Sequence, residues 1–273
     1  MQSQIISLTT DFGLKDPYVA EMKAVILDIC PKATIVDISH QIEKFNIRMG
    51  AYVLASAAQY FPKGTIHVAV VDPSVGTERR PILIETNKGF FVGPDNGVLA
   101  LAARKQGIMH MYEITNRKLM WLKISNTFHG RDVFAPAAAH LANGKLPREF
   151  GPEIHKTLTS DFAKVIKKRD KLVGEVIHID DFGNTITNFG EKELKLMNVR
   201  DTVDVELKNS RMKLKLCKAY AEAALQKLLA IVGSHDFLEI SMNQGNAADA
   251  LGIKSGDRIT LYCVKTEKST YTR

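Results

Sequence analysis

The sequence predicts an α/β protein in which an N-terminal wound α/β sheet domain precedes a smaller C-terminal β-barrel domain. Patterns typical of strands and of amphipathic helices alternate over residues 5–71, as they do in a wound sheet. Beyond residue 171 the chain instead contains short runs of alternating apolar and polar residues, which favour a small barrel. The basic segment 165–171 separates the two patterns, so we predict domains at residues 1–168 and 169–273.

The N-terminal elements follow from apolar spacing and from the prolines that end the helices. Apolar residues at helical intervals and a following proline predict helices at residues 18–29 and 47–61. We expect Asp16 to cap the first of these helices, with Pro17 at its first position. Further helices are expected at residues 98–104 and 133–141, and strands at 5–8, 34–38, 66–71, 82–86, 89–92 and 111–114.

The C-terminal half is predicted to consist of strands joined by polar loops. Two loops, residues 180–184 and 233–243, contain more acids, amides and aromatics than packing requires. They are consistent either with ordinary hairpin turns or with stacking on a purine and hydrogen bonding to its edge. The expected strands are residues 172–179, 202–207, 212–216 and 258–262.

Composition restricts the class of protein. The 273 residues are 45% apolar and 25% charged, as in soluble globular proteins, and no apolar run approaches the ~20 residues of a membrane helix. A strand pattern begins at residue 4 with no signal-peptide features before it, so we expect a cytoplasmic protein. The three cysteines are far apart and indicate neither disulfides nor a zinc site.

The net charge of +7 is compatible with nucleic acid or with an anionic substrate. Lysine and arginine are scattered, however, and the densest basic cluster, residues 164–171, contains no aromatic side chain for base stacking. We therefore interpret this cluster as a solvated linker and expect no nucleic-acid partner.

Three polar residues stand where an α/β fold places ligands. Asp72 directly follows the apolar strand 66–71, and open α/β sheets bind ligands at such strand ends; Arg79 is close enough to fold back toward it. The alternative is that Asp72 caps its own turn and the arginine lies in solvent. His129 precedes a glycine at a helix entry, although a loop histidine is also common at a surface. Asp11 follows the first strand, and calcium binding with Asp16 is the weaker interpretation because such sites need more carboxylates.

Five motifs, taken in order, resemble one family, the S-adenosylmethionine (SAM) hydrolases, also called SAM hydroxide adenosyltransferases, which are related to the fluorinase and chlorinase enzymes. The resemblance covers nearly the whole chain. The motifs are TTDFG at residues 9–13, VDPSVGTER at 71–79, PDNG at 94–97, FHGRD at 128–132 and IDDFGN at 179–184.

The resemblance implies hydrolysis of SAM to adenosine and L-methionine by a homotrimer with ligand sites between neighbouring subunits, without metal or cofactor. It implies that Asp72, Arg79 and His129 are catalytic. The residues that it assigns to substrate binding are Asp11, Asp72, Asn184, Ser234, Glu239 and Met242, with Phe182 as an aromatic wall and Phe45 and Tyr220 as further candidates.

Two other reactions remain open. The halide-using relatives, which form 5′-halo-5′-deoxyadenosine, depart from the Asp, Arg and His at those three positions. They also have a longer insertion where this chain has the short turn at residues 87–89. The other alternative is a metal-dependent nucleoside hydrolase that cuts the glycosidic bond.

Overall fold

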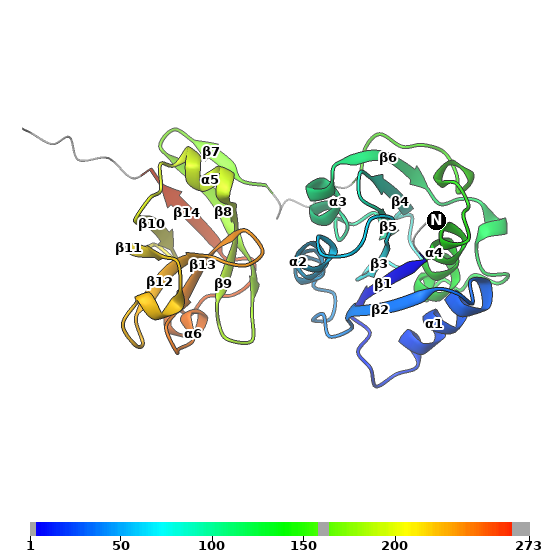
Figure 1. Ribbon diagram of the computed structural model, residues 1–273, viewed down its shortest axis with the longest axis horizontal. Helices are drawn as coiled ribbons and strands as arrows, with labels where there is room; N and C mark the ends of the chain where they lie inside the picture. The colour runs from blue at the N-terminus through cyan, green and yellow to red at the C-terminus, as the bar shows by residue number, and fades with distance from the viewer. Residues whose placement is uncertain (1–3, 158–163, 264–273) are drawn as a thin grey trace, which may run out of the picture. The chain divides into compact units, whose positions relative to one another are not determined.

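The computed structural model describes residues 4–157 and 164–263, which form two compact units, residues 1–160 and 161–273 (Figure 1). Each unit has its own hydrophobic core. Within the described residues, no helix combines the length and the apolar composition that crossing a bilayer requires.

The N-terminal unit is built on a six-stranded sheet with the strand order β2-β1-β3-β5-β4-β6. Strands β2, β1, β3 and β5 are parallel, and β4 runs antiparallel to its neighbours β5 and β6. The strands are β1 (Ile5–Thr10), β2 (Thr34–Ser39), β3 (Ile66–Val70), β4 (Pro81–Thr86), β5 (Phe90–Pro94) and β6 (Ile108–Glu113).

Helices cover both faces of this sheet, as predicted for a wound α/β domain (Figure 1). Helices α1 (Tyr18–Ile29) and α4 (Ala135–Ala142) pack on one face, and α2 (Ile47–Ala58) and α3 (Ala100–Gln106) pack on the other. Strand β3 is buried along its whole length because Ile66, Val68 and Val70 point to the first layer, while Ala69 joins the core of the second. Two short 3₁₀ helices, Arg117–Leu119 and Pro147–Glu149, lie in connecting segments.

Two predicted helix starts need correction. Pro17 is the N-cap of α1 and the Asp16 side chain makes no capping hydrogen bond, so the expected cap at Asp16 is wrong. The helix predicted at 133–141 is preceded by a π-helical turn, Gly130–Phe134, and α4 begins at Ala135. Such turns often occur at functional sites, and this one follows directly on His129.

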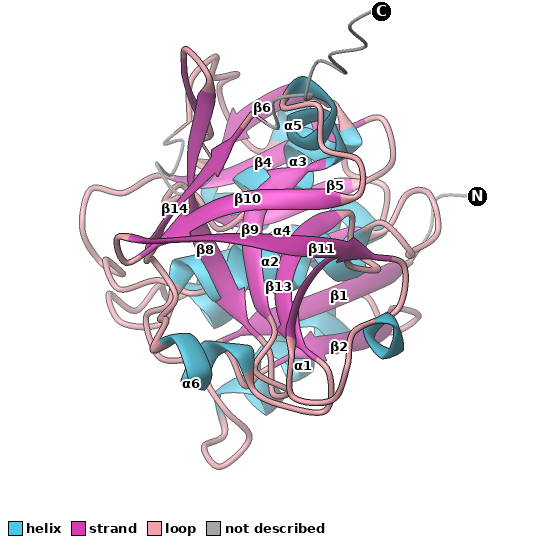
Figure 2. Ribbon diagram, turned by 90° about the vertical axis from the view of Figure 1, so that its left-hand side faces the viewer, coloured by secondary structure: helices cyan, strands magenta, loops and turns pink. Residues whose placement is uncertain are grey.

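The C-terminal unit contains a closed seven-stranded barrel with the order β14-β10-β11-β12-β13-β9-β8, which pairing between β14 and β8 completes. Closure removes the exposed edges that an open sheet would have. The short helices α5 (Glu191–Leu196) and α6 (Ala247–Leu251) lie at opposite ends of the unit (Figures 1 and 2). The barrel strands are β8 (Lys171–Ile179), β9 (Thr185–Gly190), β10 (Thr202–Leu207), β11 (Ser210–Cys217), β12 (Leu228–Val232), β13 (Phe237–Met242) and β14 (Arg258–Tyr262).

The structure corrects two predictions about this half. The basic segment interpreted as a linker contains a further strand, β7 (Ile166–Lys168), which pairs with β8. The boundary therefore lies at residue 160 and not at residue 168. The segment 233–243 is not a single loop, because most of it forms β13, in which polar Glu239 and Ser241 are buried among apolar neighbours.

Candidate active site

Asp11 and Asp72 lie together because two neighbouring parallel strands end beside each other. Strand β1 pairs with β3, and the two aspartates follow the carboxyl ends of these strands. The order in which the chain adds strands to the sheet reverses at β1, which has β2 on one side and β3 on the other. Such a switch point leaves a crevice at the strand ends in open α/β sheets.

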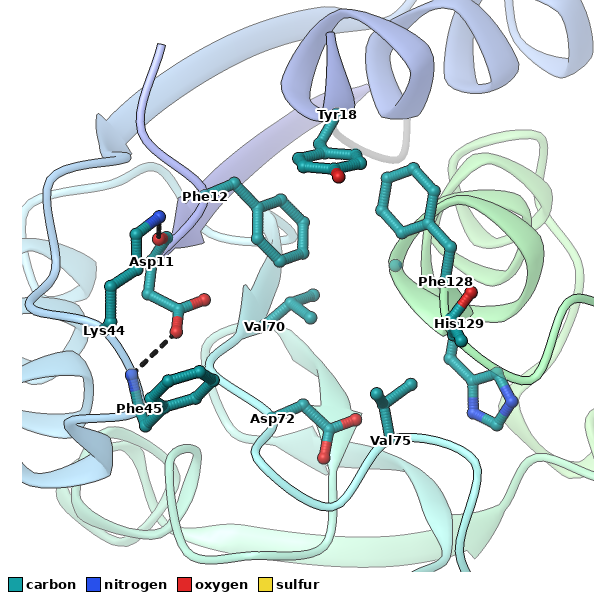
Figure 3. A pocket seen from close by; sticks show the side chains of 12 residues that line it. Asp11, Phe12, Tyr18, Lys44, Phe45, Val70, Asp72, Val75, Phe128 and His129 are labelled. Atoms are coloured by element: carbon teal, nitrogen blue, oxygen red, sulfur yellow. Dashed lines mark hydrogen bonds between the residues drawn. The ribbon is translucent and has the colours of Figure 1, made fainter. Parts of the chain in front are cut away.

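A pocket of about 350 Å³ occupies this crevice. Figure 3 shows Asp11 and Phe45 at one end, Val70 and Asp72 in the middle, and His129 at the other end. The lining residues come from four separate segments of the N-terminal unit, and they are Asp11, Phe12, Tyr18, Lys44, Phe45, Val70, Asp72, Val75, Thr127, Phe128, His129 and Gly130.

The Asp11 carboxylate is held by the segment that precedes α2. The backbone N–H of Phe45 donates to Oδ2 of Asp11 at 2.9 Å, and Lys44 Nζ donates to the Asp11 carbonyl. Phe45 adopts φ = 64°, a strained left-handed conformation for an aromatic residue, and Asn46 caps α2 directly after it. The second carboxylate oxygen of Asp11 points into the pocket (Figure 3) and can accept a hydrogen bond from a ligand.

Asp72, Arg79 and His129 form one contiguous polar cluster. Arg79 donates from Nε to Oδ2 of Asp72 at 2.8 Å and also from Nη2 to the same oxygen. Their side chains are only 5% and 4% exposed, so this ion pair is desolvated, and the interpretation of Asp72 as a simple turn cap is wrong. Within the part of the chain that the structure describes, Nη1 of Arg79 is buried without a hydrogen-bond partner.

The contact between Arg79 and His129 determines the tautomer of the imidazole. Nη2 of Arg79 lies 2.8 Å from Nδ1 of His129, and because a guanidinium can only donate, Nδ1 accepts. Burial lowers the pKa of His129 below 6.5, and the charge of Arg79 lowers it further. The neutral imidazole therefore carries its proton on Nε2, where it is a hydrogen-bond donor.

A buried carboxylate, Asp132, fixes the turn that carries His129. Asp132 is fully buried, accepts from the backbone N–H of Ser125 at 2.8 Å and accepts from Nε of Arg131 at 2.7 Å. Arg131 in turn pairs with Glu21 of α1 and lies over the ring of Phe128. The turn is thus tied to α1 and to the loop before it.

Aromatic rings form the apolar wall of the pocket. Phe12, Tyr18 and Phe128 contact one another edge to face, with centroids 5.2–5.8 Å apart. Figure 3 shows the three rings grouped on the side of the pocket away from Asp72. They provide an apolar surface that excludes water from one side of a bound molecule.

The C-terminal unit has a second pocket, of about 650 Å³. Asp180 organises one side of it by accepting from the backbone N–H groups of Phe182 and Asn184 and from the Asn184 amide at 2.9 Å. This leaves the side-chain amide oxygen of Asn184 and the 79% exposed Phe182 ring for other contacts. The lining residues are Asp180, Phe182, Asn184, Tyr220, Met242, Asn243, Gln244 and Gly245.

Glu239 lies behind this second pocket. It is 7% exposed and accepts from the Tyr220 hydroxyl at 3.3 Å, and burial raises the pKa of its carboxyl. The carboxylate packs so closely on Gly233 that a Cβ there would lie 1.8 Å from Oε1. Ser234 is an exposed residue of the turn between β12 and β13 and does not line the pocket.

The sequence-predicted residues therefore fall into two groups, one in each unit. Asp11, Phe45, Asp72 and His129 line the first pocket, with Arg79 buried against two of them. Phe182, Asn184, Tyr220 and Met242 line the second pocket, with Glu239 in contact with one of them.

Sequence reasoning did not select several lining residues. Phe12 and Phe128 lie inside quoted motifs, so their position beside Asp11 and His129 was an available signal. Tyr18 and Lys44 have no comparable signal, because their place in the pocket depends on tertiary packing. Among the described residues, no group of three His, Cys, Asp or Glu side chains is arranged to hold a metal ion.

Family models match both units of the chain. The model of the SAM hydroxide adenosyltransferase N-terminal domain matches residues 6–151, and that of the C-terminal domain matches residues 174–260. A protein named (R)-S-adenosyl-L-methionine hydrolase from Methanocaldococcus jannaschii is 39% identical over 267 residues, covering 94% of this chain and 95% of the relative. A protein of the same name from Salinispora tropica is 37% identical over 93% of this chain and 96% of the relative.

A solved structure and a more distant enzyme complete the comparison. The crystal structure of an uncharacterized conserved protein from Thermotoga maritima is 40% identical, with a TM-score of 0.85 over 94% of this chain and 99% of that one. A protein named fluorinase from Nocardia brasiliensis is 27% identical over 92% of this chain and 94% of the relative. The chain is thus more similar to the proteins named as hydrolases than to this fluorinase.

Proposed function

The chain belongs to the SAM hydroxide adenosyltransferase family, and from this premise we propose that it hydrolyses S-adenosyl-L-methionine to adenosine and L-methionine. One structural observation carries most of the weight. Asp72, Arg79 and His129, which are distant in sequence, form one cluster at a pocket of about 350 Å³, in which the Asp72–Arg79 pair is desolvated.

The reaction suits a site of this kind. Attack of water on the ribose C5′ displaces a sulfonium, so methionine leaves as a neutral thioether and needs no general acid. The protein has to align a water molecule behind C5′, accept the proton that this water loses, and stabilise the negative charge that its oxygen carries once deprotonated. Donors fixed in a dry pocket stabilise such charge strongly because water does not screen them.

We assign these tasks to the cluster. Arg79 remains protonated and holds Asp72 and neutral His129 in place, and the Nε2–H of His129 donates to the oxygen of the attacking water. Asp72 accepts a hydrogen bond from the attacking water through Oδ1 and takes the proton that the water loses as the C5′–O bond forms and the C5′–S bond breaks. Both arginine contacts are to Oδ2, and among the described residues Oδ1 has a 3.4 Å contact with the Ser74 hydroxyl. Neither a metal nor a cofactor takes part in this proposal.

Asp11 is proposed to accept from the ribose hydroxyls through the oxygen that points into the pocket. The other nucleoside contacts are proposed to come from Asn184, Ser234, Glu239 and Met242, with Phe182, Phe45 and Tyr220 as aromatic neighbours of the ligand. We also propose a homotrimer with ligand sites between neighbouring subunits, which the family resemblance suggests. Native mass spectrometry tests the assembly.

The decisive experiment is turnover of SAM in ¹⁸O-labelled water. We expect adenosine that carries the label at its 5′-oxygen, together with unlabelled methionine. Both sulfonium epimers should be supplied, because the relatives' names specify the (R) form. Free adenine that disappears with a chelator would indicate a metal-dependent nucleoside hydrolase instead.

Halide-dependent adenosyl transfer is tested in the same assay by adding chloride or fluoride. The alternative is worth testing because fluorinases are among the relatives of this chain. Formation of 5′-halo-5′-deoxyadenosine in place of labelled adenosine would overturn the hydrolase proposal.

A further inference from the structure

His40, which does not line the pocket, is linked to the loop that carries Asp11. The register of β1 against β2 shifts by one residue, so that Leu8 pairs with Asp37 but Thr9 pairs with Ser39. Such a shift changes which side chains meet across the strands. It brings His40 opposite Thr10, and Nδ1 of His40 lies 2.9 Å from the Thr10 hydroxyl.

The charges around His40 indicate the direction of these hydrogen bonds. Nε2 makes no well-directed hydrogen bond to the described residues, but it lies 3.1 Å from Oδ1 of Asp37, and a carboxylate favours the ring proton on that nitrogen. Nδ1 then accepts from the Thr10 hydroxyl. The Thr10 oxygen accepts in turn from the backbone N–H of Phe12 at 3.2 Å.

His40 holds the same loop at a second point. The backbone N–H of Gly13 donates to the His40 carbonyl at 2.8 Å. The segment Asp11–Phe12 is thus restrained through Thr10 at its start and through Gly13 at its end. Both restraints lead to His40, which is only 4% exposed.

We propose that Thr10 is a positioning residue whose hydroxyl, hydrogen-bonded to the buried His40, sets the orientation of the Asp11 carboxylate toward the ribose hydroxyls. The proposal rests on the proposed function, because it takes Asp11 as the ribose ligand. Among the residues that the structure describes, the other hydrogen bonds to Asp11 come from Phe45 and Lys44 of the segment before α2. If the hydrogen bond between the Thr10 hydroxyl and His40 is lost, the Asp11 carboxylate can move relative to the ribose hydroxyls.

The same strand contains a matched control. Ser7 of β1 and His67 of β3 form a second buried hydroxyl–imidazole pair, with Oγ 2.7 Å from Nδ1. The His67 ring packs against Phe61 and Phe91, and neither Ser7 nor His67 lines the pocket. Removing either hydroxyl therefore breaks the same kind of bond, but only Thr10 is connected to Asp11.

The experiment compares binding of adenosine, 2′-deoxyadenosine and 3′-deoxyadenosine by calorimetry to the full-length protein and three variants. Thr10→Val removes the hydroxyl at nearly constant shape, Thr10→Ser restores it, and Ser7→Ala is the control. For the wild type we expect adenosine to bind about tenfold more tightly than at least one deoxynucleoside. Thr10→Val should weaken adenosine about tenfold and the deoxynucleosides much less, so that the preference nearly disappears.

Each outcome decides the proposal. The proposal is supported if Thr10→Ser and Ser7→Ala keep the wild-type preference for adenosine over the deoxynucleosides and Thr10→Val loses it. Equal weakening of all three nucleosides by Thr10→Val overturns it, because the hydroxyl would then support only the general fold. A wild type with no preference for ribose hydroxyls also overturns it. SAM turnover by the wild type is measured separately, so failure of the proposed function is distinguishable.

Discussion

Breaking the buried Asp72–Arg79 pair should affect stability and activity in different ways. We consider Asp72→Ala, Arg79→Met and the double variant. In Asp72→Ala the guanidinium loses its counter-ion while it stays buried against His129 and the ring of Phe134. In the double variant no uncompensated charge remains.

The magnitude follows from the burial of the two side chains. They are 4% and 5% exposed, so the pair belongs to the desolvated class in which removing one partner costs about 3–5 kcal/mol. In a domain of this size about 1 kcal/mol corresponds to ~2–4 °C in Tm. Each single variant should therefore have a Tm roughly 6–20 °C below that of the wild type. The double variant should lose much less Tm than the two single losses added together.

Stability is measured by calorimetry and urea unfolding, following the transition of the N-terminal unit, and activity by chromatography of adenosine formed from SAM. We expect hydrolysis to fall by at least about 10² in all three variants, since the fixed donors or their acceptor are lost. Stability should therefore recover in the double variant, but activity should not. Additive stability losses would refute the claim that the pair is desolvated, and full hydrolysis by a folded Asp72→Ala would refute the catalytic assignment.

The remaining predictions concern single groups. Because burial and the neighbouring guanidinium lower the pKa of His129, its NMR titration should lie below pH 6.5; a midpoint above that value contradicts the proposed tautomer. Burial lowers the pKa of His67 to about 3. As the pH falls below 6.5, this histidine is therefore protonated in the unfolded chain but not in the folded one. The free energy of unfolding should then decrease, by about 1.4 kcal/mol at pH 5.5 from His67 alone. His67→Phe should remove the share of that slope that comes from His67, seen as a shallower pH dependence than wild type in urea unfolding, and an unchanged slope would contradict it. Gly233→Ala should displace the Glu239 carboxylate and weaken adenosine binding. Gly190→Ala is the control and should leave binding unchanged, because the new Cβ meets nothing closer than 3.4 Å. Equal effects of the two substitutions on adenosine binding would place Glu239 outside the site.

The spacing of apolar residues along the sequence predicted those helices and strands in which buried residues recur at regular helical or strand intervals. The helix at Tyr18–Ile29 was predicted with its observed bounds, because one apolar face and a following proline define it. A strand was predicted at residues 66–71 from its continuous apolar run, and the structure has it at Ile66–Val70, with both faces buried. Strand β13 was taken as part of a loop because Glu239 and Ser241 are polar. Leu238 and Ile240 face the barrel core, and the two polar residues are buried on the opposite face of the strand by tertiary packing.

The candidate site shows the same division. The types of side chain at strand ends and the order of five motifs selected Asp11, Asp72, Arg79 and His129 without any coordinates. The tautomer of His129, the buried support from Asp132 and the contact of His40 with the Asp11 loop were not predictable. Each depends on atoms that are 7 to 50 residues apart in the chain and meet only when it folds.

The sequence by itself therefore determined the chemistry available to this protein and most of the elements that carry it, because residue type and apolar period are local properties. Tertiary structure alone decided which nitrogen of His129 holds the proton, how dry the Asp72–Arg79 pair is, and which buried groups orient Asp11. The physical reason is that hydrogen-bond direction and desolvation depend on the distances between segments, which no local pattern encodes.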